Sequence, residues 1–194
     1  IQNIKYLQAD ILDLRDLKRN FDIVESVGVL HHMSDPVEGW KTLVNCLKPG
    51  GMIKIGLYSR LARSNIQTLR DEIANLGLKP NKNQMRVFRR SVISSSEKCH
   101  LDTHSYSDFY CLSELRDLLF HVQEHQFNIP QIKKLIANLG LDFCGFEGQD
   151  IVKKFTLDNY ADNDLYNLDK WDVFESRYKN TFAGMYQFWC QKIQ

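Results

Sequence analysis

The chain has 194 residues and a mass of 22.7 kDa, enough for one hydrophobic core, and we expect a single domain over residues 1–194. Its 25 Lys and Arg residues nearly balance its 24 Asp and Glu residues, which excludes a broad basic field for nucleic acid and a polybasic membrane anchor and leaves room for a localised patch only. The sequence has no apolar stretch of membrane-spanning length and no signal-peptide pattern at its N-terminus, so we expect a cytoplasmic protein without membrane partners.

The stretch that organises the chain covers residues 21–30, after a short amphipathic turn or helix at 12–17. Its nearly continuous apolar run is typical of a central parallel strand covered by helices on both faces, and such a strand indicates an α/β sheet. Gly28 allows the backbone to leave the sheet, and the Ser-Asp-Pro sequence at 34–36 predicts that a helix starts near Pro36.

That helix is expected to pack on the sheet through one apolar face, and a second buried strand should follow it. The Lys-Pro-Gly-Gly sequence at 48–51 ends the helix, and residues 52–58 form the second strand, which gives the order strand, helix, strand. The apolar face consists of Trp40, Leu43, Val44 and Leu47.

The rest of the chain alternates helices with two short strands, and it contains no internal repeat. In order we predict a helix over 60–76, an irregular insert with a short helix over 84–113, helices over 114–122 and 128–140, a strand over 141–147, a lid or covering helix over 149–179, and a final strand over 185–192.

Four short motifs carry a family resemblance: Phe-Asp-Ile-Val at 21–24, Val-Leu-His-His-Met at 29–33, Asp-Pro at 35–36 and Leu-Lys-Pro-Gly-Gly at 47–51. With the strand that follows, they resemble the second half of the class I S-adenosylmethionine-dependent methyltransferase domain, of the kind found alone or fused to tetratricopeptide repeats in bacteria. The regions 120–125 and 184–191 are similar to the end of such domains, more loosely. The resemblance implies a Rossmann-like, mostly parallel sheet with helices on both faces and a C-terminal antiparallel pair.

A complete domain of this family begins with a strand, a Gly-rich turn and an acidic residue after a second strand, and these 194 residues contain no Gly-x-Gly turn. The resemblance therefore implies a domain truncated at its N-terminus that starts at the third strand, over residues 4–11, and an isolated fragment that is inactive. The strand at 21–30 would then lack a neighbour, and either residues 4–9 move in beside it or a second molecule pairs with it as a homodimer.

The same resemblance assigns five residues to S-adenosylmethionine. Asp10 would accept the adenine amino group and Ile11 would pack on the adenine ring; the alternatives are a helix cap and a core residue. Ser26, Val27 and Gly28 would lie beside the methionine end of the cofactor, at the carboxyl edge of the sheet where open α/β folds bind ligands. The alternative for these three is an ordinary buried strand end.

Three further residues are candidates for the chemistry of methyl transfer to a small-molecule or unidentified acceptor. His31 or His32 would act as a general base or orient the acceptor, and the alternative is that one caps the next helix while the other packs. Tyr58 would face the acceptor and favour the cationic sulfonium by cation–π attraction, or be an ordinary amphipathic tyrosine at the strand end. Because in-line methyl transfer needs mainly proximity and a dry site, a base is required only if the acceptor holds a proton.

No metal site is predicted. Although His121 and His125 would share one helical face, and Cys99, His100 and His104 would be the nearest additional ligands, the spacing matches no zinc motif. The five cysteines are scattered and odd in number, which is unlike a disulfide framework, and most are expected to be reduced core side chains.

Two other functions fit parts of the sequence. A non-catalytic methyltransferase-like module of a larger repeat protein would lack the Gly-rich turn and the acidic residue about twenty positions further on that an enzyme carries upstream. A nicotinamide-dependent dehydrogenase would need a Gly-x-Gly-x-x-Gly turn, which this sequence does not contain.

Overall fold

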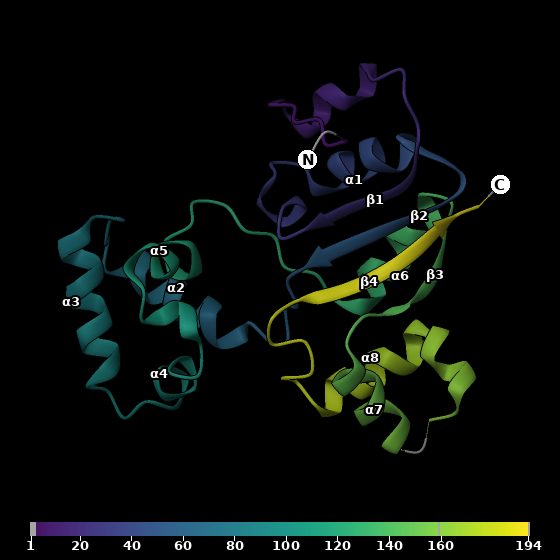
Figure 1. Ribbon diagram of the computed structural model, residues 1–194. Coiled ribbons are helices and arrows are strands. Elements are labelled where there is room, and N and C mark those ends of the chain that lie inside the picture. The colour runs from purple at the N-terminus through teal and green to yellow at the C-terminus, as the bar shows by residue number, and fades with distance from the viewer. Residues whose placement is uncertain (1–2, 159, 194) are drawn as a thin grey trace. The chain divides into compact units, whose positions relative to one another are not determined.

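The computed structural model describes residues 3–158 and 160–193. It divides into two compact units, one made of Ile1–Ser59 with His125–Gln194 and the other of Arg60–Glu124 (Figure 1). The first unit contains the sheet, and the second is helical. Within the described residues, no helix is both long and apolar enough to cross a membrane.

The first unit is built on an open four-stranded sheet in the order β1-β2-β4-β3 (Figure 1). Strands β1 (Phe21–Val27) and β2 (Leu47–Leu57) are parallel, whereas β4 (Tyr186–Lys192) runs antiparallel to both β2 and β3 (Leu141–Phe146). This confirms the α/β class and the antiparallel insertion of the final strand. The expectation of a mostly parallel sheet is wrong for the described residues: the sheet is mixed, since one pairing is parallel and two are antiparallel.

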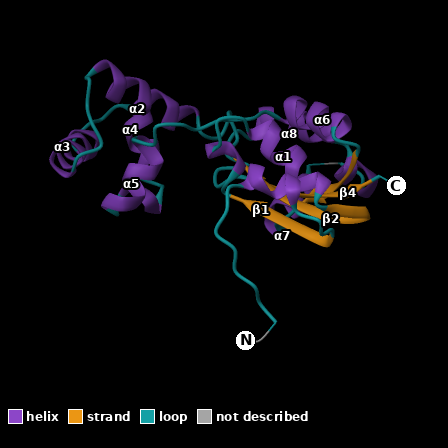
Figure 2. Cartoon of the chain, turned by 90° about the horizontal axis from the view of Figure 1, so that it is seen from above, coloured by secondary structure: helices purple, strands orange, loops and turns teal. Residues whose placement is uncertain are grey.

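Helix α1 (Pro36–Asn45) connects β1 to β2 and begins where the sequence predicts. The Asp35 side chain accepts hydrogen bonds from the backbone of Val37 and Glu38, which are otherwise unpaired donors of the first turn. Trp40 is buried, and its ring centroid lies 5.9 Å from that of Phe188 on β4. Helices α1 and α6 (Ile129–Asn138) lie on the same side of the sheet (Figure 2).

The prediction of a fully buried central strand is wrong for β1. It is an edge strand of the described sheet, and Ile23 is 57% exposed. The strand also ends earlier than predicted, at Val27, because Gly28 takes a φ of +77° and residues 30–32 form a 3-10 turn.

The predicted strand over residues 4–11 is also wrong, and with it the idea that residues 4–9 pair with β1. Residues 4–10 have no regular structure, and Tyr6 is 90% exposed. Asp10 instead caps a 3-10 helix, Ile11–Asp16, through a capping box in which its side chain accepts from Leu12 and its backbone N–H donates to the Asp13 carboxylate. This local set of hydrogen bonds turns the chain at the point where a strand would continue.

Residues 149–179 form a covering layer of two helices, α7 (Gln149–Leu157) and α8 (Leu168–Arg177), with a 3-10 helix between them. Phe155 stacks on Trp171 with a centroid distance of 3.9 Å, and both side chains are fully buried. The segment is thus helical in large part, and its role as a lid or covering helix stays a prediction.

The second unit packs four helices around its own core. They are α2 (Ser64–Asn75), α3 (Lys82–Ile93), α4 (Lys98–Thr103) and α5 (Leu112–Leu119). The expected irregular insert over 84–113 is therefore largely helical, because Met85, Phe88 and Val92 recur at helical spacing behind an Asn81 cap. Whether the two units make one domain stays a prediction.

Candidate functional site at the carboxyl edge of the sheet

The carboxyl ends of β1 and β2 meet at one edge because the two strands are parallel, with Val27 paired to Gly56. The chain leaves β1 through Gly28, where the positive φ favours glycine and where no atom lies within 4 Å of the position that a Cβ would take. Open α/β folds bind ligands outside such an edge. Val27 is 37% exposed, so the edge is not sealed beneath other side chains.

Ser26 and Gly56 define two special points of this edge. The Ser26 hydroxyl is buried, and it has no hydrogen-bond partner among the described residues, which costs free energy in the folded protein. A Cβ on Gly56 would lie 2.8 Å from the Val27 Cγ1 atom and 2.9 Å from the Met185 sulfur. A side chain at position 56 would therefore force Val27 or Met185 to shift.

His31, His32 and Tyr58 come together at the same edge, as their sequence positions after the two strands predict. The ring centroids of His31 and Tyr58 are 3.9 Å apart, those of His31 and His32 are 4.4 Å apart, and those of His32 and Tyr58 are 5.9 Å apart. His31 is fully buried in this cluster, whereas His32 and Tyr58 are half-buried. His31 is thus placed to orient its neighbours, and His32 is better placed to meet a ligand.

Residues 125–127 hold the backbone that carries two of these rings. The backbone N–H of His125 donates to the His31 carbonyl at 2.8 Å, and that of Phe127 donates to the Tyr58 carbonyl at 2.9 Å. Both turns that carry the ring cluster are therefore tied to one short segment. Sequence reasoning missed this role of residues 125–127, because hydrogen bonds between backbone groups leave no trace in residue type.

A buried carboxyl that was not predicted contacts Ser59, the residue that follows Tyr58 of the cluster. Glu175 of α8 accepts hydrogen bonds from the Ser59 hydroxyl at 2.6 Å and from the Tyr186 hydroxyl at 2.7 and 2.8 Å, and all three residues are fully buried. Burial raises the pKa of Glu175, although the two donated hydrogen bonds oppose the rise. Its sequence signal is a glutamate on the apolar stripe of α8, one position after Phe174.

Neither Asp10 nor Ile11 is found in contact with the ring cluster among the described residues. The Asp10 side chain caps the helix that follows, so the structure bears out the capping role of this residue. Ile11 is half-buried and packs against the main core. Contact of these two residues with adenine stays a prediction.

The histidine arrangement considered for a metal is wrong, because α5 ends at Leu119 and neither His121 nor His125 lies on a helix. In the second unit, ligand atoms of Glu97, Cys99 and His100 lie within 4.8 Å of one another. The His100 Nε2 atom is already 2.9 Å from a Glu72 oxygen, and the three residues lie at the N-cap and in the first turn of α4, where the helix dipole disfavours a cation. The absence of a metal stays a prediction.

The five cysteines are free, and only Cys46 and Cys190 are buried. Cys99 and Cys144 are half-buried and Cys111 is exposed, so the expectation that most are core side chains is wrong. Burial raises the pKa of the Cys46 thiol, which keeps it protonated and unreactive near neutral pH.

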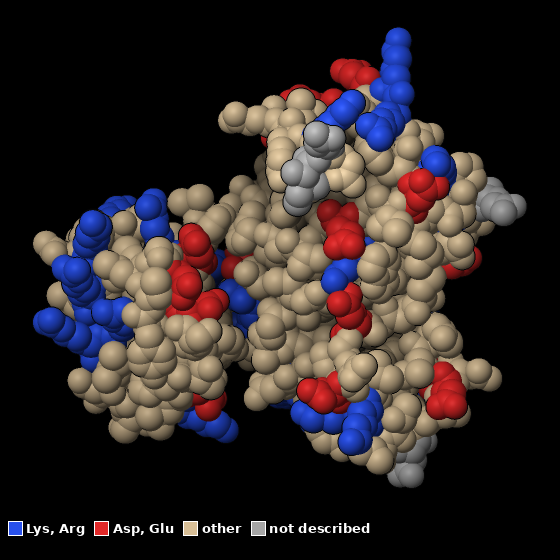
Figure 3. Space-filling view, viewed as in Figure 1, with Lys and Arg blue, Asp and Glu red and all other residues tan. Residues whose placement is uncertain are grey.

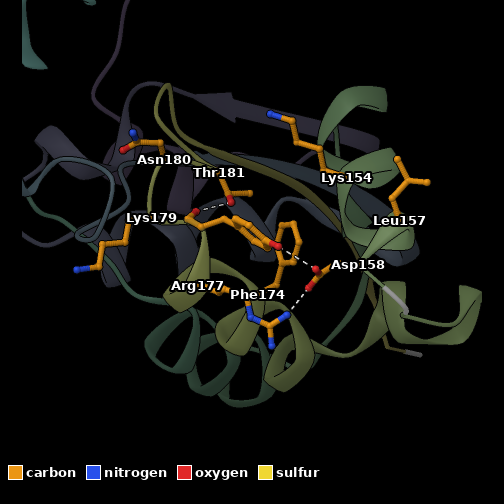
Figure 4. A pocket seen from close by; sticks show the side chains of 9 residues that line it. Lys154, Leu157, Asp158, Phe174, Arg177, Lys179, Asn180 and Thr181 are labelled. Carbon is orange, nitrogen blue, oxygen red and sulfur yellow. Dashed lines mark hydrogen bonds and ion pairs between the residues drawn. The ribbon is translucent and has the colours of Figure 1, made fainter.

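A cavity of about 790 Å³ lies between the C-terminal ends of α7 and α8 and contains none of the predicted site residues (Figure 4). At its centre Asp158 accepts from Arg177 at 2.5 Å and from the Tyr178 hydroxyl at 2.8 Å, while Lys154 and Lys179 extend away from this pair (Figure 4). Polar groups that do not converge make a poor ligand site. A smaller cavity of about 310 Å³ contains Met185, whose sulfur also borders Gly56 of the carboxyl edge.

The sheet is open, β1 ends at a half-exposed glycine turn beside the parallel β2, and the last strand is inserted antiparallel. These features are typical of Rossmann-like folds, and open α/β folds bind ligands at the carboxyl edge. Within this class, residues 1–55 match a family model described as a methyltransferase domain. This match agrees with the resemblance to class I S-adenosylmethionine-dependent methyltransferases that the motifs carry, and it covers the segment from the N-terminal 3-10 helix through most of β2. Association with tetratricopeptide repeats stays a prediction.

Individual proteins are similar to this chain over most of its length. An uncharacterised protein of Synechococcus sp. is 29% identical over 181 residues, which is 88% of this chain and 43% of that protein. The solved structure of PKMT2 from Rickettsia typhi superposes with a TM-score of 0.66 at 15% identity over 96% of this chain, and its complex with AdoHcy does so with a TM-score of 0.61. The chain spans 43% of the Synechococcus protein and 38% of PKMT2.

Proposed function

We propose that the protein transfers a methyl group from S-adenosylmethionine to an acceptor at the carboxyl edge of β1 and β2. The observation that carries the proposal is the convergence of Ser26, Gly28, His31, His32 and Tyr58 at this one edge. The match of residues 1–55 to a methyltransferase domain supports it, because that range contains all of β1 and most of β2. The solved complex of PKMT2 with AdoHcy supports it further.

The residues at the edge fit such a cofactor. The unpartnered Ser26 hydroxyl would gain a hydrogen bond to a polar group of the ligand, and the open space at Gly28 would let the ligand approach the backbone. The Tyr58 ring would favour a positive charge near its face. Asp10 and Ile11 would hold the adenine, as the family resemblance implies.

When bound, the cofactor supplies an electrophilic methyl group: the acceptor's lone pair forms the new bond to carbon while the carbon–sulfur bond breaks, leaving S-adenosylhomocysteine. The chain's own part is to hold the acceptor in line and to exclude water. Tyr58, whose ring packs against the buried His31, would form the acceptor wall. His32 would take the proton that an O–H or N–H acceptor must lose, because an imidazole titrates near neutral pH and this ring is half-buried.

Ser26 gives the sharpest test. In S26A, titration calorimetry of the full-length protein with S-adenosylhomocysteine should show affinity reduced by about 3- to 10-fold, the value of one hydrogen bond. The same variant should melt at an equal or higher temperature without ligand, because a buried unpaired hydroxyl is removed. S96A, at an exposed serine of the second unit, is the matched control and should change neither quantity.

Unchanged affinity in both S26A and the bulkier G28V would contradict the proposed cofactor site. If the wild-type full-length protein does not bind S-adenosylhomocysteine at all, the non-catalytic module becomes the better interpretation. For the acceptor we propose a small molecule, because the near-zero net charge of the chain offers no broad field that would attract nucleic acid or a membrane. We also propose a cytoplasmic location.

A further inference from the structure

Helix α3 of the second unit lies in a stretch of one-sided charge. Residues 73–96 contain five cationic side chains and no Asp or Glu, although the whole chain is nearly neutral. These side chains are Lys79, Lys82, Arg86, Arg89 and Arg90. In Figure 3 blue side chains gather over the unit that carries α3.

Three of these cations follow one another along the exposed side of α3. Lys82, Arg86 and Arg90 are spaced four residues apart, so they form a line about 12 Å long. Like charges at this spacing destabilise a helix by about 0.2 to 0.5 kcal/mol per pair. Within residues 3–158 and 160–193 none of the three has a carboxylate at ion-pair distance, in contrast to Arg63 and Arg70, which both pair with Glu124.

The line borders a groove of about 570 Å³ between α3 and α5. Lys82 and Arg86 lie on the α3 side, Arg116 lies on the α5 side, and Asp117 is its one carboxylate. The groove also has an apolar lining from Pro80, Met85 and Leu112. We call this site, with its three cations and three apolar residues, the basic groove.

We propose that the basic groove binds an acidic segment of a polypeptide partner. Cations from two helices face one cavity, so a chain of carboxylates would relieve their mutual repulsion and supply the missing ion pairs. The apolar lining suits side chains interspersed among those carboxylates, and the line along α3 continues the charge beyond what a small anion would cover. Nucleic acid fits less well, because no aromatic side chain lines the groove for base stacking.

This inference does not depend on the proposed methyl transfer. The basic groove belongs to the second unit and shares no residue with the carboxyl edge of β1 and β2. Peptide binding can therefore be measured without cofactor and without an acceptor, and S-adenosylhomocysteine binding can be measured without peptide. The two proposals can fail separately.

The test is fluorescence anisotropy of the full-length protein with a labelled eight-residue peptide of alternating Glu and Leu. We expect saturable binding that weakens as salt is raised, since exposed charges are screened within about 10 Å at 0.1 M ionic strength. R86E/R116E should weaken binding by about tenfold or more, because like charges then face the peptide. R86Q/R116Q should have a smaller effect in the same direction, and it serves as the second variant if charge reversal disturbs folding.

K134E is the matched control. Lys134 is an exposed helical lysine of the first unit, so the variant makes one of the two charge reversals of R86E/R116E away from the groove and should alter affinity by less than about twofold. Absence of peptide binding, an equal loss in K134E, or tighter binding of an eight-nucleotide oligo(dT) would each overturn the proposal. Binding of a Lys and Leu peptide as tight as that of the acidic peptide would overturn it as well.

Discussion

The two faces of the sheet differ sharply, although the same strands build both. On the side of α1 and α6, Ile53, Ile55 and Phe188 are completely buried. The alternate residues on the opposite face include Lys54, which pairs in register with Trp189. Because successive side chains of a strand point to opposite faces, one sequence of alternating character produces a closed face and a face that stays accessible.

The accessible face is held by weaker interactions. Lys54 forms an ion pair with Glu147 at 2.7 Å, and the Trp189 indole N–H donates to the same carboxylate at 3.2 Å. In the space-filling view, charges of both signs follow one another over the sheet (Figure 3). We therefore expect the closed face to contribute most of the free energy of unfolding, whereas the open face and the carboxyl edge are accessible to ligands.

The largest expected effect is on the closed face. W40A should lower the free energy of unfolding by about 3 to 5 kcal/mol, because it removes a buried ring and leaves a cavity beneath the sheet. The matched variant I23A, at the exposed edge, should cost less than about 1 kcal/mol. Urea denaturation followed by circular dichroism measures both, and equal losses would contradict the comparison.

The next effect concerns the buried carboxyl of Glu175. E175A should destabilise by about 2 to 4 kcal/mol, because the Ser59 and Tyr186 hydroxyls would be left buried without an acceptor. E175Q keeps an acceptor and should cost less. If thermal denaturation shows E175A to be as stable as the wild type, the network does not contribute to folding.

The same residue makes a prediction about pH. Burial raises the pKa of Glu175 above its ordinary value near 4.5, so the folded protein binds this proton more tightly than the unfolded chain does. Its stabilising contribution is therefore present below that ordinary value and is lost as pH rises through the folded-state pKa. Subtracting the stability of E175Q from that of the wild type across this range should isolate the decline; a flat difference would argue against it.

A smaller effect is expected where the open face meets the carboxyl edge. G56A should destabilise by about 1 to 3 kcal/mol, since the new methyl would press on Val27 and Met185. Pairing it with a smaller residue at position 27, as in G56A/V27A, should recover part of the loss. Failure of any recovery in denaturation experiments would mean that the contact with Val27 does not set the cost.

Local signals in the sequence predict the order of β1, α1 and β2, but the start of β2 is wrong: the strand begins at Leu47 and includes the Lys-Pro-Gly-Gly sequence that was expected to form a turn. Asp35 and Pro36 specify the start of α1, and the apolar runs specify the strands, whose order along the chain brings His31 and Tyr58 to one edge. The apolar run of β1 predicts a buried strand, because its own residues do not show which strands lie beside it; the edge position follows only from the family resemblance, which implies a missing neighbour.

The network of Ser59 with Glu175 joins residues 116 positions apart, and no local pattern encodes a contact at that separation. Most of the helical content of residues 84–113 was also missed, although a local pattern was present there. There the periodic residues Met85, Phe88 and Val92 were present, but polar residues between them obscured the pattern.

The smallest effect is predicted for the ion pair on the open face. K54A should cost about 0.2 to 1 kcal/mol, because Glu147 is 45% exposed and solvent screens the pair. The hydrogen bond from Lys54 lowers the pKa of Glu147, so this contribution exists above the ordinary value near 4.5 and disappears as pH falls through the folded-state pKa. Its pH dependence is thus opposite in sign to that of Glu175. Denaturation of K54A and wild type at low and high salt should converge as salt rises, and a difference that persists in high salt would place Lys54 among the packed residues of the sheet.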